Sequence, residues 1–231
     1  MGKDVIIACD FPSRTELMEF LTHFEGENPY LKIGMEMFYR EGPSIVTELK
    51  EKGCRIFLDL KLHDIPHTVY SAMKNLAILG VDITNVHASG GVAMMEAAVK
   101  GLEEGSAGRK RPELIAVTQL TSTSQTVLEE ELLITTPMAE TVKHYALNAK
   151  KAGLDGVVCS PLEAPIIKEL GLQSITPGIR FAGDSVGDQK RIATPAYAKE
   201  LGSTYIVVGR SITGASDPLA AYKKAMAEFC S

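Results

Sequence analysis

Eight short apolar segments, spaced along the whole chain, constrain the fold most strongly. They span residues 5–10, 31–34, 55–61, 83–88, 114–120, 156–160, 174–179 and 205–210. They are rich in Val and Ile and bounded by Gly, Pro or charge, as buried parallel strands usually are. Between them lie amphipathic segments at 13–24, 43–51, 68–79, 92–103, 138–152 and 196–201. Strands that alternate with helices predict parallel βαβ units.

Eight such units favour an α/β fold of the closed (β/α)8 type, a TIM barrel. The alternative is an open doubly wound sheet, which usually binds dinucleotides through G-x-G-x-x-G after its first strand. In this chain the residues at that position, 8–12, are ACDFP and do not match this motif. A barrel needs roughly 200–250 residues, and this chain has 231. Because no Pro-, Gly- or Ser-rich linker divides the chain, we expect a single domain over residues 1–231.

The charge balance and the cysteines limit the classes of partner and compartment. A net charge of −5 argues against a general nucleic-acid-binding surface, although it still allows an anionic small substrate. No apolar stretch is long enough to span a bilayer, and the chain opens without a signal peptide. The four cysteines form no C-x-x-C pair. These features predict a cytoplasmic protein with reduced cysteines and no membrane partner.

Polar side chains gather at the carboxyl ends of the expected strands. In a (β/α)8 barrel these ends form the rim on which active sites are built. One charge at a strand end is usually a solvated loop residue, but several on one rim indicate a site. The residues concerned are Asp10, Lys32, Asp59, Lys61, His87, Thr121, Arg180 and Arg210.

The third strand concentrates this charge. Strand side chains alternate between faces, so Asp59 and Lys61 should point into the barrel mouth while the leucines beside them face the helices. An ion pair that only fixes the barrel would explain these two residues equally well. Lys32 would neighbour Asp59 across the sheet and, with Asp64, give an alternating Lys-Asp-Lys-Asp array suited to a substrate whose charge changes during reaction. Asp64 could instead serve the N-terminus of the next helix.

Residues 59–69, DLKLHDIPHTV, resemble the D-x-K-x-x-D-I-P-x-T signature of the orotidine 5′-phosphate decarboxylase family. Related sugar-phosphate enzymes share the D-x-K-x-x-D part, so the wider set of motifs carries the resemblance. The other matching segments follow in the family's order along nearly the whole chain: KIG at 32–34, VTQLTS at 117–122, TPGIR at 176–180, DQ at 188–189 and VGRS at 208–211.

The resemblance implies decarboxylation of orotidine 5′-phosphate to UMP and CO2 without a cofactor or metal. Loss of CO2 from C6 leaves a carbanion that resonance stabilises poorly, so electrostatic stabilisation is needed. Lys61 would stabilise and protonate it, Asp59 would lie near the departing carboxylate, and Lys32 and Asp64 would complete the array. The substrate-binding residues implied in the same way are Asp10, Lys32, Asp59, Thr68, Thr121, Arg180, Gln189, Gly209 and Arg210.

The resemblance also implies a homodimer in which Asp64 and Thr68 reach into the partner subunit's site. The segment 181–189, rich in Gly, Asp and Ser, is expected to form a loop that could close over phosphate. Two alternatives remain: a Mg2+-dependent sugar-phosphate decarboxylase or aldolase of the same superfamily, and a non-catalytic nucleotide-binding barrel. His63 and His67 could suggest a metal site, but Pro66 lies between them, so a shared ligand face is not expected.

Overall fold

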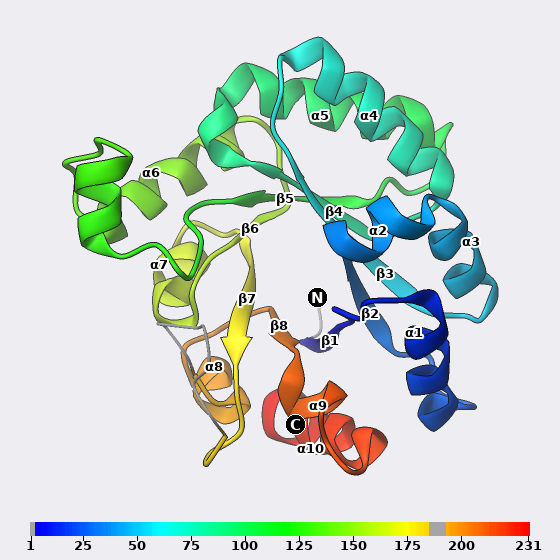
Figure 1. The fold of residues 1–231 in the computed structure, drawn as a ribbon. Coiled ribbons are helices and arrows are strands. Elements are labelled where there is room, and N and C mark those ends of the chain that lie inside the picture. The colour runs from blue at the N-terminus through cyan, green and yellow to red at the C-terminus, as the bar shows by residue number, and fades with distance from the viewer. Residues whose placement is uncertain (1–2, 185–192) are drawn as a thin grey trace.

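The computed structural model describes residues 3–184 and 193–231 and contains a closed barrel of eight parallel strands. Each strand pairs with the next one in the sequence, and β8 pairs with β1 to close the barrel. The predicted (β/α)8 fold is therefore confirmed (Figure 1). The strands are β1 (Asp4–Ala8), β2 (Tyr30–Gly34), β3 (Arg55–Leu62), β4 (Ile83–His87), β5 (Glu113–Val117), β6 (Gly156–Val158), β7 (Gln173–Ile179) and β8 (Tyr205–Val208).

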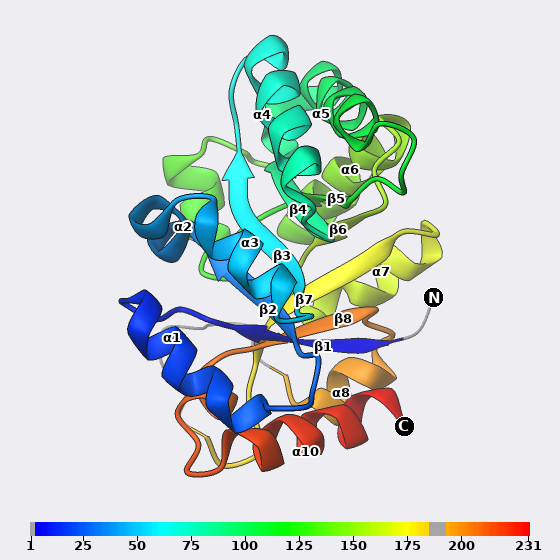
Figure 2. The same ribbon diagram turned by 90° about the vertical axis from the view of Figure 1, so that its right-hand side faces the viewer.

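Helices surround the strands, as Figure 1 shows, and α10 runs alongside β1 (Figure 2). Among the described residues, no helix combines the length and the apolar character needed to cross a membrane. The α-helices are α1 (Arg14–Leu21), α2 (Met35–Glu41), α3 (Ser44–Glu51), α4 (Pro66–Leu79), α5 (Gly91–Ser106), α6 (Met138–Lys151), α7 (Ala164–Glu169), α8 (Pro195–Glu200), α9 (Arg210–Thr213) and α10 (Pro218–Cys230); shorter 3-10 turns cover Thr22–Phe24, Ala88–Gly90 and Pro161–Glu163, and a π-helical turn covers Val127–Glu131.

Several predicted strands extended too far at their carboxyl ends. The first, fifth and eighth were expected to continue to residues 10, 120 and 210, whereas β1 ends at Ala8, β5 at Val117 and β8 at Val208. At the rim the chain leaves the strand and turns toward the next helix, so apolar residues such as Leu120 continue the sequence pattern beyond the last residue of the strand. Of the polar residues assigned to strand ends, Asp10, Thr121 and Arg180 consequently lie on loops after their strands and Arg210 begins α9, whereas Lys32, Asp59, Lys61 and His87 remain within strands.

Buried apolar residues form two layers, one inside the barrel and one between the strands and the helices, so the functional site can lie only at an end of the barrel. The barrel interior is filled by Phe57 of β3 and its neighbours from the other strands, and the second layer, which includes Leu58 and Leu60, lies between the strands and the helices. The predicted alternation of faces along β3 is thus confirmed as far as Leu60. The interior cluster comprises Ile6, Ala8, Tyr30, Phe57, Ile83, Ile115, Ile175, Tyr205 and Val207.

Two aspartates fasten strands at the opposite, amino end of the barrel. Asp82 Oδ2 accepts hydrogen bonds from the backbone N–H of Ile56 and from Lys50 Nζ, both at 2.7 Å. Asp155 Oδ2 accepts in the same way from the backbone N–H of Leu114 at 2.7 Å and from an Arg111 guanidinium nitrogen at 2.6 Å. Each carboxylate therefore joins a loop, a strand and a cation. Of the basic stretch 105–112, residues 107–112 form the loop that leads from α5 into β5 at this end.

Candidate active site

Lys32, Asp59 and Lys61 meet at the carboxyl end of the barrel. Lys61 Nζ lies 2.7 Å from Asp59 Oδ1, and Lys32 Nζ lies 3.5 Å from Asp59 Oδ2 and 3.0 Å from Asp10 Oδ1. The Asp59 side chain is 11% exposed, so its carboxylate is nearly buried between two ammonium groups. The sequence-predicted grouping of these residues is what the structure shows. Lys32 reaches Asp59 diagonally, because the strand register pairs Asp59 with Gly34.

The backbone of β3 is irregular at this point, which simple alternation did not predict. Pairing with β4 is regular up to Leu58 and resumes at Leu62, so three residues of β3 lie opposite Asn85 alone. Lys61 has a left-handed backbone with φ of 52°, a conformation that costs on the order of 1–3 kcal/mol for a non-glycine residue. Bulges of this kind commonly re-aim a side chain beside an active site. Here the bulge brings the Lys61 ammonium back onto Asp59.

Asn85 connects the left-handed backbone of Lys61 to the buried carboxylate of Asp59. Its Oδ1 accepts the backbone N–H of Lys61 at 2.7 Å, and its Nδ2 donates to Asp59 Oδ1 at 2.7 Å. The Asn85 side chain is fully buried in the neighbouring strand β4. Asn85 was not among the residues predicted from the sequence. Its one signal was a polar amide in the middle of the apolar run ITNVH at 83–87.

The charges in this cluster stabilise one another. Burial alone would raise the pKa of Asp59, but Lys32 and Lys61, with the hydrogen bonds from Lys61 and Asn85, hold that pKa below its usual value. Burial would lower the pKa of Lys32, but Asp59 and Asp10 outweigh it and hold the pKa above its usual value. Asp59 is therefore an anion and Lys32 a cation at neutral pH. Together with Lys61 they form a site in which a developing negative charge would be stabilised.

Two adjoining cavities open at this end of the barrel. One, of about 340 Å³, is lined by Lys32, Asp59, Lys61 and Thr121, together with apolar side chains of the barrel mouth. The other, of about 600 Å³, shares Lys32, Pro177 and Val207 with the first. Its remaining lining residues are Ala8, Asp10, Gly178, Arg180, Gly209, Arg210 and Thr213. Ten of the residues implied by the resemblance fall within the described chain, and eight of them line one of these two cavities: Lys32, Asp59, Lys61, Thr121, Asp10, Arg180, Gly209 and Arg210.

The second cavity is cationic on the side of β7 and β8. Arg180 is buried and donates to the carbonyl of Ile179 at 2.8 Å, and Arg210 is the first residue of α9. Beside them, Ser211 Oγ donates to Asp184 Oδ2 at 2.5 Å, which ties the start of the β7–α8 loop to α9. Gln189, which the resemblance assigns to the same loop, lies outside the described residues.

Asp64 and Thr68 do not join the cluster within this chain. Both side chains are exposed, and neither lines the two cavities. Asp64 Oδ1 accepts the backbone N–H of Ile65 at 2.6 Å, just before α4 begins at Pro66. Within one chain the array therefore has three members, Lys32, Asp59 and Lys61, and Asp64 does not contribute the fourth.

The histidines near the site interact with different rings. His63 packs against His87 with ring centroids 5.7 Å apart, whereas His67 stacks on Tyr70 at 6.2 Å. Burial, His63 and Lys61 lower the pKa of His87. Within the described ranges, three or more His, Cys, Asp or Glu side chains do not gather in a way that could hold a metal ion.

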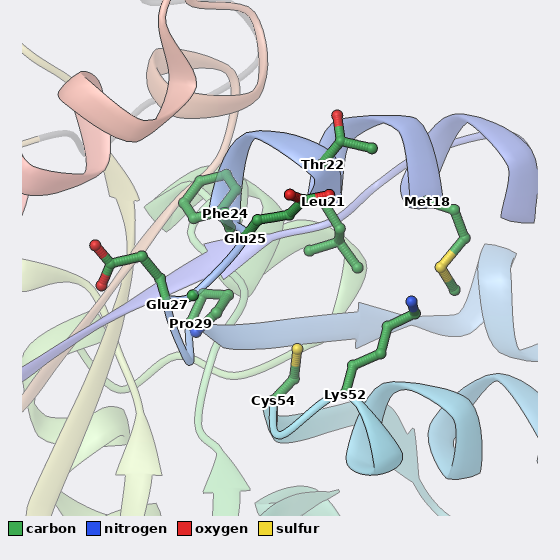
Figure 3. A pocket seen from close by; sticks show the side chains of 10 residues that line it. Met18, Leu21, Thr22, Phe24, Glu25, Glu27, Pro29, Lys52 and Cys54 are labelled. Carbon is green, nitrogen blue, oxygen red and sulfur yellow. The ribbon is translucent and has the colours of Figure 1, made fainter.

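A further cavity of about 240 Å³ lies at the opposite end of the barrel (Figure 3). It is bordered by Pro29 and Cys54, which precede β2 and β3, and by Met18 and Leu21 of α1. Lys52 is the one cation among its lining residues, which also include Glu25 and Glu27. This cavity lacks the convergent charges of the carboxyl rim, where barrel enzymes place their chemistry.

A closed parallel barrel that holds a buried carboxylate between two lysines at its carboxyl rim defines a (β/α)8-barrel enzyme with a site for a small anionic substrate. Comparison with known proteins specifies the class further, because residues 3–225 match the Orotidine 5′-phosphate decarboxylase / HUMPS family. The chain belongs to this family.

Its relatives agree in name and in structure. The curated proteins named orotidine 5′-phosphate decarboxylase from Bacillus mycoides and Bacillus anthracis are each 59% identical to it over 227 residues, which cover 96% of this chain and 95% of theirs. The solved orotidine 5′-phosphate decarboxylase of Lactobacillus acidophilus has a TM-score of 0.88 at 44% identity, covering 99% of this chain and 100% of that one. An uncharacterized conserved protein of Geobacillus kaustophilus has a TM-score of 0.88 at 51% identity, covering 97% and 99%.

Proposed function

We propose that this protein decarboxylates orotidine 5′-phosphate to UMP and CO2. The observation that carries the proposal is the placement of the Lys61 ammonium on the buried Asp59 carboxylate, in a cavity that adjoins a second, cationic one. A pyrimidine ring fits the first cavity and a phosphate the second. The family match and the names of the 59%-identical relatives support the same reaction.

Lys61 acts at C6 of the pyrimidine. The bond from C6 to the carboxylate breaks, CO2 leaves, and the electron pair of that bond remains on C6. The ammonium of Lys61 stabilises this charge and then donates its proton to C6, after which Lys61 recovers a proton from solvent. Asp59 holds the ammonium in place and lies near the departing carboxylate, and Lys32 holds Asp59 ionised.

The rest of the substrate is bound across the two cavities. Thr121 approaches the base or ribose in the first cavity, and Asp10 with Lys32 binds ribose hydroxyls where the cavities meet. Arg180, Gly209 and Arg210 bind the phosphate, and Gln189, which lies outside the described residues, contributes to the same binding site. Arginine suits this role because its guanidinium donates two parallel hydrogen bonds to phosphate oxygens. Binding energy from the remote phosphate helps to organise the site for chemistry at C6.

The functional unit is a homodimer in which Asp64 and Thr68 of one subunit complete the site of the other. Their exposure at the rim of their own barrel supports this arrangement, and the apolar side chain that follows Asp64, Ile65, is 67% exposed. Tyr39 of α2, after the strand that carries Lys32, is 71% exposed. Large contiguous apolar patches mark protein interfaces, and the proposed homodimer would bury these two side chains in one. We further propose that the enzyme acts in the cytoplasm.

Following the loss of orotate absorbance with purified protein tests the reaction. We expect turnover of orotidine 5′-phosphate that persists in the presence of EDTA and needs no added cofactor. Activity that EDTA abolishes would favour the Mg2+-dependent sugar-phosphate chemistry instead. A protein that binds UMP and leaves orotidine 5′-phosphate unchanged would be a nucleotide-binding barrel.

A further inference from the structure

We infer that Asn85 is a positioning residue for the reaction, through the contacts that it makes with the backbone of Lys61 and the carboxylate of Asp59. This inference rests on the proposed role of Lys61. Asn85 does not line either cavity of the rim, so its effect on catalysis passes through these two residues.

The two hydrogen bonds require an amide at this position. The backbone N–H of Lys61 is only a donor, and the ionised Asp59 carboxylate is only an acceptor, so Asn85 must present its oxygen to the first and its nitrogen to the second. The orientation of the amide is thereby fixed by its partners. A leucine has the same branching of side-chain heavy atoms but is larger and offers neither group, and an aspartate offers an acceptor to both partners unless it carries a proton.

The location of Asn85 explains why the bulge needs it. Three residues of β3 lie opposite this single residue of β4, so the Lys61 N–H has lost its regular ladder partner. The Asn85 oxygen supplies a replacement and holds Lys61 in its left-handed conformation, which directs the ammonium toward the cavity. Asp59 Oδ1 accepts from both Asn85 Nδ2 and Lys61 Nζ, so the same amide also fixes the carboxylate that orients the ammonium.

Asn85→Leu, compared with Thr84→Val, tests the inference. Thr84 is the adjacent residue on β4, is equally buried and also hydrogen-bonds to β3, through Oγ1 to the carbonyl of Leu58 at 3.2 Å, away from the charged cluster. For Asn85→Leu we expect kcat to fall by about 10- to 100-fold, as for a misplaced catalytic group, with KM within about 3-fold of wild type. For Thr84→Val we expect kcat within about 2-fold.

Asn85→Asp adds a second measurement, the pH dependence of kcat, which a purely structural role of Asn85 would leave unchanged. Protonated, the introduced carboxyl group can accept from Lys61 N–H and donate to Asp59, as the amide does; ionised, it faces Asp59 as a second anion. The other titratable groups around this pair are Lys61, whose ammonium contacts Asp59, Lys32 on β2, and His63 and His87 at the ends of β3 and β4. Because the wild type shares them, the ratio of variant to wild-type kcat isolates the new group, and we expect this ratio to fall as pH rises.

The outcomes separate this inference from the proposed function. Absence of wild-type turnover, or full activity of Lys61→Ala, would overturn the proposed function. If those two results are as proposed, a folded Asn85→Leu protein with wild-type kcat, or one whose loss lies in KM alone, would overturn the role of Asn85. If Asn85→Leu does not fold, the pH ratio of Asn85→Asp decides: a flat ratio contradicts the inference, and a falling ratio supports it.

Discussion

Lys61 donates from its ammonium to Asp59 Oδ1 at 2.7 Å, although only one residue separates them on a strand and Lys61 itself has a left-handed backbone. In a regular strand, side chains two residues apart point the same way but extend side by side. The bulge instead turns the lysine back over the carboxylate. The chain thus accepts local strain at the position where the proposed chemistry needs a fixed ammonium.

Replacing Lys61 by alanine tests its proposed role directly. We expect the decarboxylation rate to fall by at least ~10²-fold, because the change removes a general acid and the charge that stabilises the carbanion. Orotate absorbance gives the rate, and UMP binding shows that the site is still formed. Lys143→Ala, at an exposed lysine of α6, is the matched control and should leave the rate unchanged. Equal rates for the two variants would contradict the role of Lys61.

Mixing two inactive variants tests the shared site. Asp64→Ala and Lys61→Ala proteins should each have little activity alone, since each removes a member of the proposed array. If Asp64 acts in the partner subunit's site, a hybrid dimer contains one site with both defects and one intact site. We expect co-refolded mixtures to regain up to about one quarter of the wild-type activity, the share of intact sites when subunits pair at random. Mixtures no more active than their components would place Asp64 outside the partner's site.

The cationic cavity should discriminate ligands by their phosphate. We expect Arg210→Ala to weaken UMP binding by about 10- to 100-fold, which corresponds to losing one charge-assisted contact of about 1.5–3 kcal/mol. Uridine, which lacks the phosphate, should bind the variant and the wild type equally. Titration calorimetry with both ligands measures the difference. Equal losses for UMP and uridine would mean that Arg210 shapes the cavity rather than binding phosphate.

Glu113 carries a buried carboxyl group at the amino end of the barrel. Replacing this group by a neutral amide should stabilise the protein to an extent that depends on pH. Burial, with Asp155 nearby, raises the pKa of Glu113, whose carboxylate accepts from the Tyr205 hydroxyl at 3.4 Å. A carboxyl group whose pKa is raised by folding destabilises the native state above that pKa, and the penalty disappears below the unfolded value. Glu113→Gln should therefore raise Tm at pH 7–8, by about 1–3 °C, and have little effect near pH 4.

Differential scanning calorimetry at the two pH values measures this effect. The exposed Glu103→Gln on α5 removes the same charge without burial and should change Tm by less than about 1 °C at either pH. A Glu113→Gln gain that is equal at both pH values would indicate a packing effect instead of a titration.

The sequence predicts the barrel and most of its site because both depend on local patterns. The eight apolar runs correspond to β1–β8, and polar residues within or just after them, such as Lys32 and Arg180, line the cavities as expected. These predictions need only that parallel strands place their carboxyl ends together. Thr121 was located in the same way.

The bulge and its support could not be obtained from such patterns. Alternation predicts the correct faces for Asp59 and Lys61, but it contains no information on the register between β3 and β4, which creates the bulge. Asn85 acquires its importance only from that register. The ends of β1 and β8 were each placed two residues too late for a similar reason, since the sequence does not show where strand pairing stops.

Asp82 and Asp155 hold the amino ends of the strands with carboxylates that are engaged by backbone N–H groups and cations of their own vicinity. Neighbouring strands are thereby held together at the end of the barrel opposite the cavities that Lys32 lines. Loops at the carboxyl rim can change in length and sequence over evolution without disturbing the hydrogen bonds of Asp82 and Asp155. A barrel of this kind can acquire new substrates through changes in the loops of its carboxyl end, while the residues that hold its amino end together are retained.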